Sequence, residues 1–360
     1  MNHILVVTSL LATLLAPVHP APAPAHEDLR AALRPVLDAG APGVIALVRH
    51  GRRVDEVAVG TADLGTGRPM SPDDHVRVGS VTKTFVAVVA LQLVAEHRLR
   101  LDAPVSTVLP GVLPYGAAVT VRQLLDHTSG VPDYFDRILP LYTTDPGTWL
   151  RRWQPSELVA SIAGEPPLFP PGSQWHYSNT DYILMGMAIE RITGRSLAAE
   201  VRQRVITPLR LRDTTFPTGT VDLPPPAAQG YLTGTGGAPL DVTEFDPSVA
   251  WAAGAMISTV ADLATFYREL FTGALLPDRQ LAQLLTTVDA GGFGYGLGIF
   301  ILTTPCGPAI GHNGAIFGFG VDAFTSPDGS RQVVLADNAF SFTGAPLLAQ
   351  EQLIAGLFCT

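Results

Sequence analysis

The sequence predicts an α+β protein, in which an antiparallel sheet is built from both ends of the chain and a mainly helical insertion lies between them. Short β-rich runs occur near each end of the chain, whereas apolar residues recur at helical spacing through the middle. Gly and Pro, 35 and 31 residues of 360, are scattered among apolar runs and separate the elements. Strands at both ends with helices between them are typical of this class.

The individual elements follow from local periodicity and turn signals. A first helix is expected over 28–39, and a hairpin with strands at 44–49 and 54–60 turns at His50-Gly51-Arg52-Arg53. A long and largely buried helix is expected over 81–99. Further helices are expected at 121–126, 156–162, 181–193, 261–272 and 345–358, and further strands at 295–302, 318–325 and 332–336.

The first 25 residues are expected to be a secretory signal peptide. An apolar stretch from Ile4 to Val18 precedes Ala23-Pro24-Ala25, a small-x-small cleavage pattern. The stretch is shorter than the roughly 20 apolar residues that span a bilayer, so a membrane anchor is the weaker alternative. We therefore expect a secreted monomer with no stable membrane anchor. An α/β domain would be formed by 26–98 and 221–360, with a mainly helical domain at 99–220 between its two parts.

The charge and the cysteines limit the possible functions. The formal net charge is −9, which has the wrong sign for a nucleic-acid-binding protein. Two cysteines are too few for a Cys-based zinc site. In an oxidising compartment Cys306 and Cys359 are expected to form a disulfide between the last helix and the preceding strand region, contributing roughly 4 kcal/mol. Two buried free thiols are the alternative.

Lys83 is the single lysine in a chain that has 22 arginines. It lies three residues after Ser80 at the start of the long helix, and this spacing places both side chains on one helix face. A lysine can lose its proton at neutral pH and an arginine cannot. Burial and the helix dipole would lower the pKa of Lys83. We therefore interpret Ser80 as a nucleophile with Lys83 as its base, the alternative being a capping serine followed by a surface lysine.

Two further segments carry candidate catalytic groups. Tyr177 and Asn179 lie two residues apart on an expected extended segment and so point the same way. A phenol can pass a proton to a leaving group, and an amide can hold a substrate carbonyl and the lysine; the alternative is a helix cap. In Gly311-His312-Asn313-Gly314-Ala315, beside a strand, the glycines would let a substrate approach closely. His312 would add a donor or a positive charge, unless it is an isolated surface histidine.

At these three sites together, the sequence resembles the serine penicillin-recognising superfamily of class C β-lactamases and D-alanyl-D-alanine carboxypeptidases. Its members carry S-x-x-K, Y-x-N and K/H-x-G in this order. The sequence is most similar to the secreted actinobacterial D-alanyl-D-alanine carboxypeptidases, over nearly all of residues 26–360. The matching segments are 77–83, 125–130, 177–179 and 294–298. The resemblance implies the β-lactamase/transpeptidase-like fold, a disulfide between the two cysteines, and no metal or cofactor.

The resemblance also implies a role for each matching residue. Ser80 would be acylated and Lys83 would accept its proton, while Tyr177 would exchange a proton first with the leaving group and then with the attacking water. Asn179 would position the substrate amide, and His312 would assist the proton network. The resemblance further implies an oxyanion hole, formed by the backbone N–H groups of Ser80 and Ala315, and a substrate cleft lined by Trp251, Asn313, Gly314 and Phe300.

Three of these positions depart from the carboxypeptidase pattern. Phe300, Asn313 and Ala315 stand where such carboxypeptidases usually carry an Arg and Thr residues that bind the terminal carboxylate of the substrate. A buried carboxylate without a partner charge is costly. A free C-terminal D-Ala would therefore be held poorly, and amides, esters or longer D-peptides would be preferred.

The sequence therefore predicts a secreted serine hydrolase that acts through a Ser80 acyl-enzyme, closest to a D-alanyl-D-alanine carboxypeptidase-like D-peptidase. Its substrates would be small peptides, esters or β-lactams, with peptidoglycan as a candidate source. Alternatives are an esterase or class-C-like β-lactamase on the same scaffold, and a non-catalytic sensor of peptidoglycan or β-lactams. A Ser-His-Asp hydrolase using Asp126 and His127 is a further rival, but the chain contains no G-x-S-x-G. We accordingly expect a His127→Ala variant to keep full activity.

Overall fold

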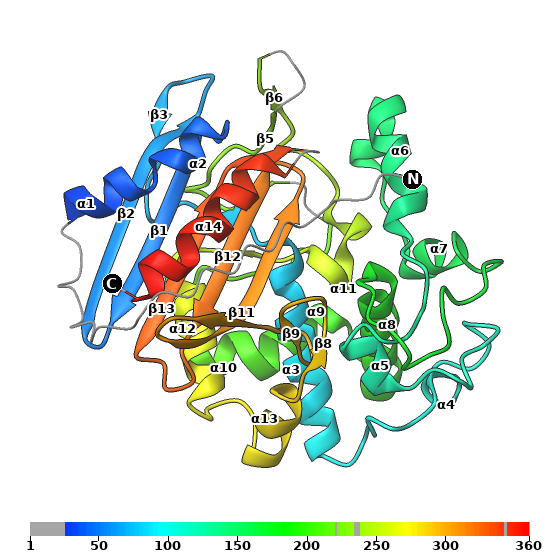
Figure 1. Ribbon diagram of the computed structural model, residues 1–360. Coiled ribbons are helices and arrows are strands. Elements are labelled where there is room, and N and C mark those ends of the chain that lie inside the picture. The colour runs from blue at the N-terminus through cyan, green and yellow to red at the C-terminus, as the bar shows by residue number, and fades with distance from the viewer. Residues whose placement is uncertain (1–25, 220–221, 234–237, 342–343, 360) are drawn as a thin grey trace.

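Strands from both ends of the chain form one sheet, as the sequence predicts (Figure 1). The computed structural model describes residues 26–219, 222–233, 238–341 and 344–359, and the expected signal peptide lies outside them. The central sheet has nine antiparallel strands in the order β3-β2-β1-β13-β12-β11-β10-β9-β8. Its two halves join where β1 pairs with β13, with Val44 opposite Asp337.

The strands and helices have the following bounds. The strands are β1 (Gly43–His50), β2 (Arg53–Asp63), β3 (Arg68–Pro69), β4 (Val76–Arg77), β5 (Tyr231–Thr233), β6 (Leu240–Asp241), β7 (Ile257–Ser258), β8 (Val288–Asp289), β9 (Gly294–Tyr295), β10 (Phe300–Thr304), β11 (Gly307–Ile316), β12 (Phe319–Thr325), β13 (Arg331–Asp337) and β14 (Ala339–Ser341). The helices are α1 (His26–Ala32), α2 (Arg34–Asp38), α3 (Thr82–Ala95), α4 (Val105–Val108), α5 (Val121–Leu125), α6 (Phe135–Thr144), α7 (Pro155–Ala160), α8 (Asn179–Thr193), α9 (Leu197–Val201), α10 (Thr207–Leu209), α11 (Trp251–Gly254), α12 (Val260–Phe271), α13 (Asp278–Leu284) and α14 (Ala345–Cys359). Strands β14, β5 and β6 form a second sheet, and β4 pairs with β7.

Helices cover both faces of the central sheet. Successive side chains of a strand point to opposite faces, and β13 shows the two resulting cores. Val333 and Leu335 pack with α14 and with the N-terminal helices, whereas Val334 and Ala336 belong to the larger core that contains α3 and α12. Figure 1 shows α14 crossing the sheet on one side. The sheet therefore separates a small core beneath the C-terminal helix from a large core on its other side.

Helix α3 runs through the large core. Its residues are apolar or small on every side, and eleven of its fourteen residues are buried, including Lys83. A helix that is apolar all round is expected to be buried rather than amphipathic. Helices α8, α9, α11 and α13 pack around it. The helix ends earlier than the expected 81–99, because His97 takes a left-handed backbone conformation (φ +58°) just after it.

The C-terminal strands differ from the expectation in two ways. The strand expected over 295–302 is broken between β9 and β10, where Gly298 adopts φ +78°. A Cβ at Gly298 would lie 2.9 Å from Ala87 of α3, so this turn allows close packing on the central helix. The segment 311–315, expected beside a strand, lies within strand β11. Its glycines weakened the sequence signal for a strand.

The two cysteines form the expected disulfide. Cys306, in the turn between β10 and β11, is bonded to Cys359 at the end of α14, with 5.5 Å between their Cα atoms. The bond fastens the helix that covers the small core to the strand pair beneath it. None of the helices in the described ranges is long and apolar enough to cross a membrane.

Removing the disulfide should lower the free energy of unfolding by about 4 kcal/mol, because it frees a long loop in the unfolded chain. The measurement is urea unfolding of the oxidised protein and of the double variant Cys306→Ser/Cys359→Ser. Reductant should destabilise the parent protein and leave the double variant unchanged. Equal unfolding free energies for the two proteins would show that the bond does not stabilise the fold.

Candidate active site

The candidate nucleophile lies in a tight turn directly before the central helix. Ser80 occupies the single 3-10 turn Gly79–Val81, and α3 follows at once. Gly79 has φ +49°, and a Cβ at this position would lie 2.9 Å from the backbone nitrogen of Ala315. Glycine is therefore required here both by the backbone conformation and by the close approach of β11. The turn places Ser80 between helix α3 and strand β11.

Lys83 is completely buried one helical turn after Ser80. Its Nζ atom lies 3.0 Å from Ser80 Oγ, 2.7 Å from Asn179 Oδ1 and 2.8 Å from the carbonyl oxygen of Ala253. These three partners come from the nucleophile turn, from the start of α8 and from α11. The S-x-x-K spacing thus brings the amine into contact with the serine hydroxyl, as the sequence predicts.

The surroundings of Lys83 favour its neutral form. Burial lowers the pKa of Lys83 to about 7, against the opposing attraction of the Asp133 and Asp181 carboxyl groups. A neutral amine has two N–H donors and one lone pair. The two donors match the oxygens of Asn179 and Ala253, which leaves the lone pair for the Ser80 hydroxyl. This arrangement suits an amine that accepts the proton of the nucleophile.

Tyr177 lies over the same amine. Lys83 Nζ is 4.7 Å from the centre of the Tyr177 ring. Burial raises the pKa of the Tyr177 phenol above its usual value, and a hydrogen bond with Ser80 opposes that rise in part. The phenol is therefore protonated at neutral pH and can donate a proton. Of the two groups, Lys83 is suited to be the base and Tyr177 the acid.

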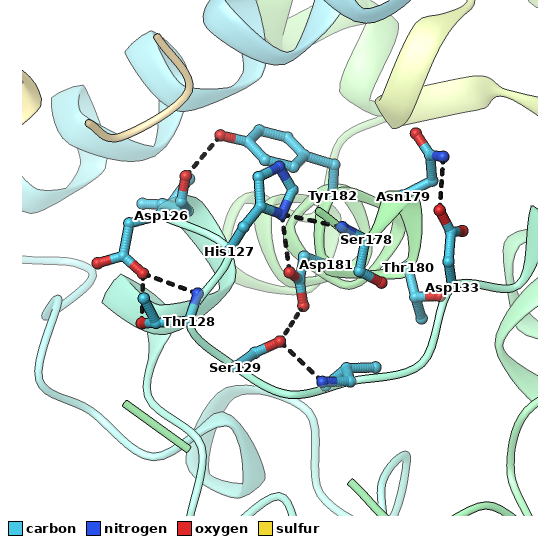
Figure 2. Close-up of polar contacts among 12 residues, drawn as sticks. Asp126, His127, Thr128, Ser129, Asp133, Ser178, Asn179, Thr180, Asp181 and Tyr182 are labelled. Atoms are coloured by element: carbon cyan, nitrogen blue, oxygen red, sulfur yellow. Dashed lines mark hydrogen bonds and ion pairs between the residues drawn. The ribbon is translucent and has the colours of Figure 1, made fainter. Parts of the chain in front are cut away.

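Asn179 is oriented by its two neighbours. Its Oδ1 accepts a hydrogen bond from Lys83, and its Nδ2 donates to Asp133 Oδ2 at 2.8 Å (Figure 2). The Asp133 carboxyl also accepts from the backbone N–H of Phe135 at 2.9 Å, which fixes its position. Asn179 opens helix α8, and the residue before it, Ser178, makes no side-chain cap. The side-chain amide of Asn179 has a second N–H donor, which the hydrogen bond to Asp133 does not use.

Strand β11 supplies the backbone next to the nucleophile. Its pairing with β10 ends at Gly311, and beyond that point β11 lies against the Gly79–Val81 turn. A Cβ at Gly314 would lie 2.1 Å from the carbonyl oxygen of Val78 and 2.9 Å from Ser80 N. Only glycine fits between the strand and the turn. The backbone N–H groups of Ser80 and Ala315 are therefore brought close together, as an oxyanion hole requires.

His312 is buried, which disfavours the positive charge considered for it. Burial lowers its pKa to about 3. Its Nδ1 donates to the carbonyl oxygen of Asn313, so Nε2 carries the lone pair and accepts from the Tyr295 hydroxyl at 3.0 Å. The ring lies 6.4 Å from that of Tyr177, centre to centre. His312 thus borders the proton-transfer groups without a direct hydrogen bond to them among the described contacts.

Asn313 does not face the nucleophile, in contrast to the substrate contact expected for its side chain. It points to the opposite side of the sheet from His312 and donates from Nδ2 to Glu351 of α14 at 2.8 Å. The physical reason is strand alternation, which sends neighbouring side chains to opposite faces. The backbone next to Asn313, at Gly314 and Ala315, still borders the Ser80 turn.

Trp251 is also placed differently from its expected position in the cleft. Its indole lies against Gly186 of α8, where a Cβ would be 2.8 Å from the ring. It lines a hollow with Arg152 and Glu190, to which Ser80, Lys83 and Tyr177 do not contribute. Its position suggests a structural contribution, since Trp251 opens α11, the helix whose Ala253 carbonyl accepts from Lys83.

An aromatic cluster adjoins the proton-transfer groups. Phe300 packs against Tyr295 (4.8 Å between ring centres), His312 (4.7 Å) and Phe293 (5.2 Å), and Phe293 contacts Trp175 (5.8 Å). Trp175, Phe293 and Phe300 remain partly exposed. This edge of the site is therefore apolar where the carboxypeptidase pattern would place an arginine.

The alternative of a Ser-His-Asp hydrolase is wrong about the residues that pair, because His127 does not pair with Asp126. His127 contacts Asp181, with 2.9 Å between Nδ1 and Oδ2, whereas Asp126 accepts hydrogen bonds from the Thr128 backbone and hydroxyl (Figure 2). No hydrogen bond joins His127 to Ser80 among the described contacts. Within the described residues, no group of three or more His, Cys, Asp or Glu side chains could hold a metal ion.

Several groups at the site were not identified from the sequence. Asp133 and the carbonyl of Ala253 hold Asn179 and Lys83, yet neither lies in a local pattern that suggests chemistry. Tyr295 does lie within a matching segment, 294–298, which could have indicated it. The partnership of His127 with Asp181 was missed because it joins two segments far apart in the sequence.

Comparison with known proteins places the chain in the Beta-lactamase family, whose sequence profile matches residues 29–355. Esterase EstB of Burkholderia gladioli is 40% identical over 188 residues, which cover 48% of this chain and 47% of the esterase, so the match spans about half of that relative. Penicillin-binding protein 4 of Amycolatopsis lactamdurans is 30% identical over 296 residues, covering 76% of this chain and 74% of that protein.

A solved structure has a similar fold over most of its length. The D-stereospecific amidohydrolase from a Streptomyces species superimposes with a TM-score of 0.82 at 40% identity, covering 88% of this chain and 95% of that one. The expected resemblance to the serine penicillin-recognising superfamily and the expected fold are thereby confirmed. The protein is a serine hydrolase of this superfamily.

A Gly314→Ala variant should acylate about 10²-fold more slowly, because its Cβ would force β11 away from Ser80 and disturb the oxyanion donors. The measurement is the rate of ester turnover together with the melting temperature. Gly356→Ala on α14 is the matched control, since a Cβ there meets nothing within 4 Å. Unchanged turnover in Gly314→Ala would show that the contact between β11 and the turn is not needed for acylation.

Proposed function

We propose that this protein is a D-peptidase that acts through an acyl-enzyme on Ser80 and favours amides, esters and longer D-peptides over free C-terminal D-Ala-D-Ala ends. The observation that carries the proposal is the buried amine of Lys83, held within 3.0 Å of Ser80 Oγ. A serine beside a neutral, preorganised base is the arrangement that nucleophilic catalysis needs.

The acylation step follows from the positions of the groups. Ser80 Oγ attacks the substrate carbonyl carbon while its proton passes to the Lys83 lone pair. The carbonyl oxygen becomes an oxyanion that accepts from the backbone N–H groups of Ser80 and Ala315. As the bond from carbon to the leaving nitrogen breaks, the Tyr177 phenol gives its proton to that nitrogen and takes the proton held by Lys83. Water then repeats the sequence in reverse and releases the acid.

The aromatic cluster supports this choice of substrate. A terminal carboxylate beside Phe300 would meet aromatic rings instead of a guanidinium, and such a charge would lose its hydration without a partner. An amide, an ester or a further residue carries no charge at that point. The 40% identity to a D-stereospecific amidohydrolase is consistent with a preference for D-configured acyl groups.

An esterase is the second candidate, favoured by the match to an esterase over 188 residues at 40% identity. The same Ser80 and Lys83 would serve both reactions. The two candidates differ in whether the protonated Tyr177 is used, because an amine leaving group needs a proton and a good alkoxide or phenoxide leaving group does not.

The test compares D-alanine amide, acetyl-D-Ala-D-Ala, p-nitrophenyl butyrate and benzylpenicillin as substrates, with L-alanine amide as the control for handedness. We expect D-alanine amide to be turned over faster than acetyl-D-Ala-D-Ala, and Ser80→Ala to lose activity on every substrate. Turnover of the butyrate ester alone would favour an esterase, and rapid hydrolysis of benzylpenicillin a β-lactamase. Equal activity in Ser80→Ala would overturn the acyl-enzyme.

Activity should rise with pH through about 7, the pKa of Lys83. The group must be neutral to accept a proton, so below that pKa the rate should fall about tenfold for each pH unit. The measurement is kcat/KM for p-nitrophenyl butyrate, which carries no titrating group. Lys83→Arg should be inactive throughout, since arginine keeps its proton. A profile that stays flat until pH values near those of an ordinary lysine would contradict a lowered pKa.

A further inference from the structure

We propose that His127 and Asp181 form a buried positioning pair that holds Tyr177 in place as the proton donor to an amine leaving group. The inference rests on the proposed function, because it concerns how that same site is fitted for amides. Neither residue contacts the nucleophile through a described hydrogen bond, so the pair would act through Tyr177.

The first observation is the packing of the histidine. His127 follows α5 with φ +60°, a left-handed conformation that is uncommon for a residue with a side chain. Its ring is completely buried and lies 4.4 Å from the Tyr177 ring, centre to centre. The rings of Tyr295 and Tyr182 lie at 5.0 Å and 5.4 Å. The unusual backbone conformation thus directs the imidazole onto the catalytic phenol.

The second observation is that His127 is bonded to both neighbours of Tyr177. The backbone N–H of His176 donates to the carbonyl oxygen of His127 at 2.9 Å. The backbone N–H of Ser178 points at His127 Nδ1 at 3.4 Å (Figure 2). Tyr177 is therefore supported on each side along the chain and across its ring face by a single residue.

The third observation is that Asp181 holds the imidazole in turn. Its Oδ2 lies 2.9 Å from His127 Nδ1, and its Oδ1 accepts from the Ser129 hydroxyl at 2.6 Å. Ser129 Oγ itself accepts from the Val131 backbone N–H at 3.0 Å, so the carboxyl is anchored to the loop after α5. His127, Ser129 and Asp181 are all buried. The result is a continuous chain of contacts from that loop to Tyr177.

His127 Nδ1 has two contacts of unequal length. The contact with Asp181 Oδ2, at 2.9 Å, is the shorter one, and the Ser178 N–H lies farther away at 3.4 Å, so a single proton is shared between Nδ1 and the carboxyl group. Burial lowers the pKa of His127 and raises that of Asp181, which agrees with a neutral pair. Of the charged or titrating groups around the pair, Lys83, His176 and His312 act on His127, and Asp126, Asp133 and Lys83 act on Asp181. An ionised Asp181 would raise the pKa of Lys83, so a neutral pair keeps that amine available as a base.

This arrangement changes the expectation for His127. Loss of the imidazole should misplace the Tyr177 phenol and leave Ser80 and Lys83 in place. The defect should therefore depend on the leaving group, because an anilide needs a proton from Tyr177 and a p-nitrophenyl ester does not. A merely structural role would impair both substrates alike.

The experiment measures kcat and KM for D-alanine p-nitroanilide and D-alanine p-nitrophenyl ester, which share one acyl group. Tyr177→Phe and His127→Ala should each lower kcat for the anilide by about 10²-fold or more, while the ester changes by less than about tenfold. The double variant should be no worse than Tyr177→Phe alone. His97→Ala is the matched control and should behave as the parent, since His97 shares the left-handed conformation (φ +58°) but is exposed.

Two further variants keep the test decisive if His127→Ala does not fold. Asp181→Ala should show the same selective loss, and Asp181→Asn should restore most of it, because an uncharged amide can donate to Nδ1 or accept from it, as the neutral carboxyl group can. Equal losses on both substrates, additive losses in the double variant, or no recovery in Asp181→Asn would overturn the inference. If Tyr177→Phe itself fails to discriminate, the proton-donor role in the proposed function fails together with the inference.

Discussion

The burial of the Lys83 amine is the constraint on which the candidate site depends. A lysine that is completely buried can remain neutral near pH 7 only if each of its polar positions has a partner of the right kind. Its three partners come from the Ser80 turn, from helix α8 and from helix α11. These elements must therefore converge on α3. Gly186 and Gly298 permit this convergence by letting Trp251 and the β9–β10 turn approach the helices closely.

The sequence was sufficient where the contacts of the candidate site depend on local spacing. Ser80 and Lys83 lie one helical turn apart, and Tyr177 and Asn179 two residues apart, so each pair could be predicted from separation alone. The α+β class was also predictable, because the short apolar runs of β1 and β13 and the long apolar run of α3 are strong signals. Strand β11 was hidden, since its glycines and His312 lack the β-branched pattern of a typical strand. Its alternation would have sent Asn313 and His312 to opposite faces.

Partners far apart in the chain could not be predicted in this way. Asp126 and His127 are neighbours in the sequence, yet the left-handed conformation of His127 turns the imidazole toward Asp181. The Ala253 carbonyl is a backbone atom, and no residue type identifies it. Trp251 is a large aromatic residue of the kind that lines ligand clefts, but its indole packs against Gly186 of α8. In each case the tertiary arrangement sets the contacts of the residue, and residue type alone does not indicate them.

The joining of both chain ends in one sheet has a consequence for synthesis of the protein. Ser80 and Lys83 leave the ribosome more than 200 residues before β11, which supplies the backbone beside the nucleophile. Strand β1 likewise can pair with β13 only after β13 has been made. A nascent chain thus carries a serine and a lysine without the surroundings that activate them. Hydrolytic competence can therefore arise only after β11 has been made, so shorter nascent chains lack it.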